Sequence, residues 1–184
     1  VAARRNPFLS DPDAVYIVAM RELVEAFPED REAKVLLGLV LENGYVGSTK
    51  LPEDGTAESL TLLRQVLSID SNHVGAMHFL IHALEGGRDI GDAVAFADRY
   101  AALVPEIPHA LHMPGHVYGL TGRYDDAVQA FLKAAAKERE YIEADESYSK
   151  MPYLHNEMLF IHVLGLQGNY RDAMSRIVDL MSVR

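Results

Sequence analysis

The sequence repeats itself with a period of 34 residues, and this period limits the chain to few folds. Residues 72–105 align over residues 106–139 without a gap. A third copy follows at 152–183, after an insertion of 12 residues. A fixed period of this length is typical of a solenoid built from helix–turn–helix units.

The spacing of the apolar residues also favours helices. Val128, Phe131, Leu132 and Ala135 recur at helical intervals, and the period-two alternation of half-buried strands is missing from the sequence. Glycine and proline punctuate the segments between helices. We expect nine helices, over residues 12–27, 30–43, 56–69, 73–85, 90–103, 108–121, 124–142, 152–167 and 170–182.

The length of 184 residues suits a single domain, 1–184. We divide it into an N-terminal helix, 12–27, and four repeats at about 30–71, 72–105, 106–139 and 152–183. Two insertions interrupt the repeats. Residues 44–55, with three glycines and a proline, read as a loop. Residues 142–153 are expected to extend the preceding helix and then to form a lid that brings Tyr148 and Tyr153 near the histidines described below.

The repeat carries residues of a known family. In the second copy these are Gly115, Tyr118, Ala127, Phe131 and Ala134, and the turn motif Gly-x-Tyr-x-Asp-Ala occurs at 122–127 and 168–173. Residues 30–183 therefore resemble the tetratricopeptide repeat (TPR) family. The resemblance implies an all-α, right-handed superhelical solenoid of TPR-like repeats, but not a function, because TPR arrays have many roles.

Seven of the eight histidines occupy three positions of the repeat. With the copies counted from residues 74, 108 and 154, these are positions 2, 5 and 9. The histidines there are His78, His82, His109, His112, His116, His155 and His162. Gly75 and Met158 occupy the two remaining places, and such regularity is not expected from random scatter.

These positions form one narrow stripe, since each helical residue turns by about 100°. The family's packing positions lie on a largely opposite face, so we expect that the histidines do not pack the first helix of a repeat against its partner. In the TPR family this stripe lines the concave groove that binds ligands. Neighbouring helices lie about 8–10 Å apart, so imidazoles from adjacent helices can converge.

The histidine spacing predicts a metal site. His78 and His82 are four residues apart, as are His112 and His116, and this spacing lets one helix hold one ion. Glu85 shares the face of His82 and is expected to bind the metal or to orient a histidine. The predicted ligands are His78, His82, His112, His116, His155, His162 and Glu85; His109, Tyr118 and Met158 are expected to line the groove.

The runs HVGAMHFLIHALE, PHALHMPGHVYGLTGRY and PYLHNEMLF further resemble a His-rich subgroup of bacterial TPR proteins. The chain departs from the subgroup at Val74, where the subgroup has proline, and at Met158, where it has histidine. The second difference removes a candidate ligand, for which His162 can compensate. The resemblance supports a histidine site but names no reaction.

Two single residues lead to further expectations. His73 directly precedes a helix and is interpreted as a turn or capping residue. Pro114 lies inside an expected helix, where it removes a hydrogen bond. Either the helix begins near Pro114 or it bends there.

Composition excludes several classes of function. The formal net charge of −10, with no basic stripe on any expected helix, argues against nucleic-acid binding. No apolar run reaches membrane-spanning length. No signal peptide is visible, which favours a cytoplasmic location; because the chain begins with Val1 rather than Met, a fragment that lacks its targeting segment is the alternative.

The sequence thus favours a His-lined groove that binds a divalent transition metal. Because the chain has no cysteine, the donors must be imidazole and oxygen, which suits Zn, Cu, Ni or Fe. If the protein is a metal-dependent enzyme, the ion would activate water or dioxygen. The alternatives are a metal-free TPR scaffold that binds a peptide, protein or small-molecule ligand, and a pH-responsive binding module. A clamp for carboxylates is disfavoured, because the stripe has no Lys or Arg.

Overall fold

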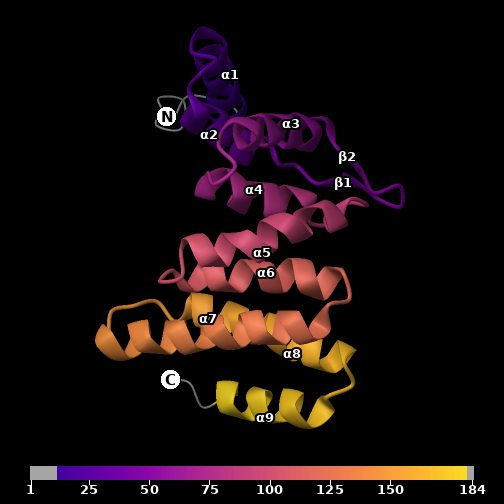
Figure 1. The fold of residues 1–184 in the computed structure, drawn as a ribbon, viewed down its shortest axis with the longest axis vertical. Coiled ribbons are helices and arrows are strands. Elements are labelled where there is room, and N and C mark those ends of the chain that lie inside the picture. The colour runs from indigo at the N-terminus through magenta and orange to yellow at the C-terminus, as the bar shows by residue number, and fades with distance from the viewer. Residues whose placement is uncertain (1–11, 182–184) are drawn as a thin grey trace. The chain divides into compact units, whose positions relative to one another are not determined.

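The computed structural model describes residues 12–181, which are helical apart from short connections and one hairpin (Figure 1). The helices are α1 (Pro12–Ala26), α2 (Arg31–Leu41), α3 (Asp54–Ile69), α4 (Val74–Leu84), α5 (Val94–Leu103), α6 (Pro108–Leu120), α7 (Tyr124–Ala144), α8 (Met151–Leu166) and α9 (Tyr170–Met181); a 3₁₀ turn, Ile90–Ala93, precedes α5. Each helix lies close to a predicted range, and the all-α prediction is confirmed. Within 12–181, no helix combines the length and the apolar character needed to cross a bilayer.

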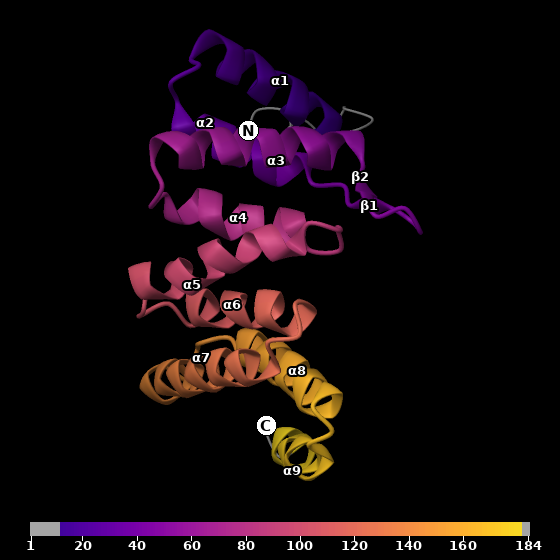
Figure 2. The same ribbon diagram turned by 45° about the vertical axis from the view of Figure 1, so that its right-hand side comes forward.

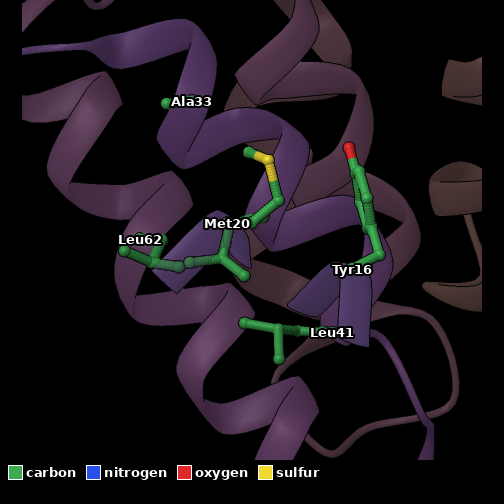
Figure 3. Close-up of a cluster of buried hydrophobic side chains, with 6 residues drawn as sticks. Tyr16, Met20, Ala33, Leu41 and Leu62 are labelled. Carbon is green, nitrogen blue, oxygen red and sulfur yellow. The ribbon is translucent and has the colours of Figure 1, made fainter. Parts of the chain in front are cut away.

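The chain divides into two compact units, Val1–Asp89 and Ile90–Arg184. The boundary falls inside the predicted repeat 72–105. In the first unit each helix packs on the next, and α2 also contacts α4. Its core contains Tyr16, Met20, Ala33, Leu41 and Leu62, all buried, together with Leu37 (Figure 3).

The segment predicted as a loop at 44–55 contains a short antiparallel hairpin. Strand β1 (Tyr45–Val46) pairs with β2 (Leu51–Pro52), with Tyr45 opposite Pro52. The hydroxyl of Tyr45 donates a hydrogen bond to the backbone carbonyl of Ala83, near the end of α4. The hairpin is therefore attached to the first unit by Tyr45, a contact that no local sequence pattern indicates.

In the second unit α5 to α9 pack on one another in order, and α6 also contacts α8 (Figure 2). Its core is built on the aromatic pair Phe131 and Phe160, whose ring centroids are 6.1 Å apart. Contacts between a helix and the second helix after it are expected when helix pairs stack as repeats. In this way α6 and α8, the first helices of two successive repeats, become neighbours.

The two glycine turns of the repeat have the same conformation. Gly122 and Gly168 have φ of 78° and 74°, a left-handed conformation that glycine adopts without steric cost. Just after them, the N–H of Arg123 donates to the carbonyl of Tyr118, and the N–H of Asn169 donates to that of Leu164. Each turn is therefore a Schellman ending, which closes one helix and starts the next.

The structure shows where α6 begins. It starts at Pro108, a favourable first position, and continues through Pro114 to Leu120. The alternative in which the helix begins near Pro114 is therefore wrong. His109 and His112 lie within the helix and not on a turn before it.

The insertion 142–153 is partly helical, as predicted, because α7 continues to Ala144. Tyr148 then lies against Tyr141, with ring centroids 5.3 Å apart. Tyr153 is buried and accepts a hydrogen bond of 2.9 Å from Arg139 of α7. Tyr153 lies two residues before His155, so the two side chains project from opposite sides of α8. Tyr153 therefore points away from His155, contrary to the lid prediction.

The close approach of α6 and α7 leads to a stability prediction. A Cβ atom at Gly115 would lie 2.4 Å from the ring of Phe131, which is buried. Gly115→Ala should therefore lower the free energy of unfolding by about 1–3 kcal/mol through overpacking. Urea denaturation followed by circular dichroism measures this change.

Gly165→Ala is the matched control. Gly165 lies in α8 of the same unit, and nothing lies within 4 Å of a Cβ built there. This variant should be unchanged or more stable by up to about 1 kcal/mol, because alanine favours the helix. Equal stability of the two variants would contradict the packing argument.

Candidate functional site

Three predicted ligands meet in the second unit. His112 and His116 of α6 and His155 of α8 each offer a nitrogen atom, and these atoms all lie within 4.8 Å of one another. The ring centroid of His112 is 4.6 Å from that of His116 and 5.0 Å from that of His155. His112 is buried, His116 is half-buried and His155 is exposed. The cluster, named here the His112–His116–His155 triad, is therefore accessible from the side of His155.

Asn156 holds His112 in place, although the sequence analysis did not select it. Its Oδ1 lies 2.9 Å from Nδ1 of His112, and its Nδ2 donates a hydrogen bond of 3.0 Å to the carbonyl of Phe131. Because Nδ2 is used as the donor, Oδ1 faces the imidazole as an acceptor. Nδ1 of His112 therefore carries the proton, and its Nε2 offers a lone pair.

One sequence signal points to Asn156. It occupies position 3 of the third copy, where the first two copies have Ala76 and Ala110, both fully buried. A polar residue at a position that the other copies bury needs a hydrogen-bond partner. The partners, His112 and Phe131, come from two other helices, so only the structure identifies them.

The two histidines of α6 are in direct contact. Their Nε2 atoms are 2.6 Å apart. Since Nε2 of His112 is an acceptor, Nε2 of His116 is the donor in the metal-free protein. Two imidazoles on one tetrahedral ion, with bonds of about 2.0–2.1 Å, place their nitrogens about 3.3 Å apart. The rings would thus have to separate by a fraction of an ångström to hold an ion.

The environment keeps His112 neutral. Its pKa falls from 6.5 to about 3, first because of burial and then because of repulsion by His116, while the hydrogen bond with Asn156 acts in the opposite direction. His155 and His109 lower the pKa further. A neutral imidazole is the form that can bind a metal, so the packing keeps His112 in the form that a ligand would need.

The burial of His112 corrects one prediction. His112 is only 2% exposed, and its ring lies 5.3 Å from that of Phe131 in α7. The expectation that these histidines do not pack α6 against its partner is therefore wrong for His112. The cause is α8, which covers the flank of α6 where position 5 lies.

The other predicted residues of this unit lie around the triad or away from it. His109 is exposed and stacks beside His112 at 5.7 Å. His162 lies two turns beyond His155 on α8 and outside the triad, and Met158 is 64% exposed. Tyr118 donates a hydrogen bond of 2.6 Å to Asp98 of α5, and Arg123 covers its ring. Tyr118 thus lies between α5 and α6, at a packing position of the repeat, and its expected place in the histidine-lined groove stays a prediction.

The first unit holds the other predicted ligands. His78 and His82 lie side by side on α4, with ring centroids 4.9 Å apart. Nδ1 of His82 is 3.6 Å from Oε1 of Glu85, which caps the helix. Glu85 therefore lies beside His82, where its spacing in the sequence predicts it.

His73 is the N-cap of α4. Its Nδ1 accepts a hydrogen bond of 3.2 Å from the N–H of Ala76, and its Nε2 lies 3.1 Å from Oε1 of Glu32. The interpretation of His73 as a capping residue is confirmed.

Comparisons with known proteins support the fold. No family model and no curated protein matches the sequence. A crystal structure of MamA is 16% identical, covers 90% of this chain and 79% of its own, and has a TM-score of 0.68. A structure of MamA residues 41 to the end, from Desulfovibrio magneticus RS-1, is 15% identical and has a TM-score of 0.70. This match covers 92% of the present chain and 84% of the MamA chain. MamA is a TPR-like, all-helical protein, so the TPR-like fold is confirmed, whereas the His-rich subgroup remains a prediction.

The low pKa of His112 predicts that acid destabilises the protein. Between pH 6.5 and about 3 the unfolded chain binds a proton at this residue that the folded protein does not bind. Because of His112, the free energy of unfolding should therefore fall by about 1.4 kcal/mol for each unit by which the pH is lowered within this range. Above pH 6.5, His112 should not make the stability depend on pH. Urea denaturation of the metal-free protein at several pH values measures this slope.

His112→Gln is the comparison. It lacks the titrating ring, so the slope of its unfolding free energy against pH should be smaller than that of the unaltered protein. The difference should correspond to about one bound proton. The same slope in both proteins would show that His112 titrates normally in the folded state.

Proposed function

We propose that the His112–His116–His155 triad binds a divalent transition metal ion. The observation that carries the proposal is the convergence of three imidazole nitrogens within 4.8 Å. Two of them come from one turn of α6 and the third from α8, so the packing of two successive repeats creates the site. A polar groove that only contacts peptide backbone does not require this convergence.

The chemistry of the triad fits such an ion. Its donors are neutral imidazoles, and the chain has no thiolate, which suits Zn, Cu, Ni or Fe. Asn156 fixes the ring of His112 through the nitrogen that does not face the other histidines, as second partners of metal-binding histidines do. Three protein ligands leave a coordination position for water or another molecule.

A second candidate function is the binding of a peptide or protein. The TPR-like fold suits it, and a groove of about 740 Å³ lies along α7, α8 and α9. Phe160 and Leu164 line this groove, and both lie on a largely opposite side of α8 from His155. A peptide in this groove would not meet the triad, so metal and peptide binding are separable.

Metal should stabilise the fold through the triad. At free zinc about a hundredfold above its dissociation constant, a site present only in the folded state adds about 2.7 kcal/mol. The variant His116→Ala/His155→Ala should lose one bound zinc equivalent and this stabilisation. Neither residue is buried, so the variant should fold. Calorimetric titration and urea denaturation at neutral pH, with and without chelator, measure both quantities.

His162→Ala is the matched control, an exposed histidine of the same α8 outside the triad. It should bind as much zinc as the unaltered protein. If the double variant also keeps all its zinc, or if the unaltered protein binds none, the metal proposal fails and the peptide-binding function takes its place.

Replacement of Asn156 should weaken the site without removing a ligand. Asn156→Leu leaves the buried Nδ1–H of His112 without its acceptor, which should cost about 1–3 kcal/mol of stability. The same variant should bind zinc about 10–100-fold more weakly, because the ring of His112 is no longer oriented. Unchanged zinc affinity in a folded Asn156→Leu protein would contradict this role.

A further inference from the structure

One face of α8 carries a row of exposed side chains, named here the α8 stripe. Its members are Met151, His155, Met158, His162 and Leu166, all exposed. Because each helical residue turns by about 100°, these five side chains leave the helix within about 80° of one another. The three apolar members are 67%, 64% and 49% exposed. A contiguous apolar row of this kind marks a surface that another molecule covers.

The repeat shows that a helix packs on this face. His112 and Met158 both occupy position 5 of their copies. His112 is 2% exposed because α8 covers that flank of α6, whereas Met158 is 64% exposed. The described residues therefore leave open on α8 the same face that α8 itself covers on α6.

Helix α9 carries a second exposed apolar row. Tyr170, Met174 and Val178 are 69%, 56% and 62% exposed. In the preceding copy the places of Tyr170 and Met174 are taken by Tyr124 and Val128, which pack against a core cluster that includes residues of α8. The positions of α9 that correspond to this packing are open in the same way as the face of α8.

The α8 stripe reads almost the same in both directions of the chain. Met151 and Leu166 lie equally far from the midpoint between residues 158 and 159, and so do His155 and His162. An antiparallel copy of α8, related by a two-fold axis beside Met158, would therefore place apolar residues against apolar residues and imidazoles against imidazoles. Neutral imidazoles can bond to each other, because each has one donor and one acceptor. A face that matches itself is what an isologous dimer requires.

Charge and area also favour a second copy as the occupant. The chain has a formal net charge of −10, so two copies repel each other over most of their surface. The two apolar rows contain no acidic residue and thus offer a face where this repulsion is weakest. Their exposed side chains can bury on the order of 800 Å², which is what one partner contributes to a stable interface.

We propose that two copies of this chain associate through the α8 stripe, with α8 antiparallel to α8 and the two-fold axis beside Met158. The exposed row of α9 extends the contact. The association does not rest on the metal proposal, because apolar contacts carry it. His155 belongs to both the stripe and the triad, so the second copy would also cover the exposed side of the triad.

The test is the mass of the full chain in solution, measured by sedimentation equilibrium at neutral pH with chelator present. The unaltered chain should have twice the mass of one copy. Met158→Lys should raise the dissociation constant of the dimer at least about a hundredfold, because like charges would face each other across the axis. Val18→Lys is the matched control, since Val18 is 54% exposed on α1 and lies outside the stripe. It should leave the dimer intact.

A cross-link tests the position of the axis. The chain has no cysteine, so Met158→Cys introduces a single thiol. Mild oxidation with diamide should join two copies of this variant through a disulfide, because residues beside a two-fold axis lie close to their own equivalents. Val18→Cys should cross-link far more slowly. A monomeric unaltered chain, a dimer that withstands Met158→Lys, or equal cross-linking of the two cysteine variants would overturn the proposal. Failure of the zinc site would leave all these results unchanged, since chelator is present throughout.

Discussion

The second unit depends on the close approach of α6 and α7 at Gly115. Because Gly115 has no side chain, the buried ring of Phe131 can lie directly on the backbone of α6. The same ring contacts His112 and Phe160, and the carbonyl of Phe131 accepts the amide of Asn156. One aromatic residue therefore joins the packing of the repeat to the geometry of the histidines, so a change in helix packing would also displace the candidate site.

The burial of His112 has an energetic cost, and it also suits the proposed role of this residue as a metal ligand. An imidazole with little access to water resists protonation, so we expect the folded protein to lose stability in acid. In return, the ring stays neutral and is held in one orientation by Asn156, which are the two conditions a metal ligand needs. Exposed His155 supplies access that buried His112 lacks. The triad thus combines one rigid, buried donor with one that solvent and ions can reach.

Helices and turns could be predicted from the sequence because their signals are local. The Schellman turns at Gly122 and Gly168 need only a glycine and its neighbours, and the histidine stripe needs only helical spacing. The role of Asn156 could not be predicted, since its partners, His112 and Phe131, lie on other helices. The burial of His112 likewise depends on how α8 covers α6, which no repeat position specifies.

The two histidine pairs share one spacing but not one environment. Glu85, at the end of α4, corresponds in the repeat to Gly119 of α6. A Cβ on Gly119 would lie 3.2 Å from a methyl group of Val163 of α8, so a longer side chain there would press against α8. In the proposed metal site, the imidazole that joins His112 and His116 is His155 of α8. The same histidine spacing thus places a pair beside a carboxylate in the first unit and a pair beside a third imidazole in the second.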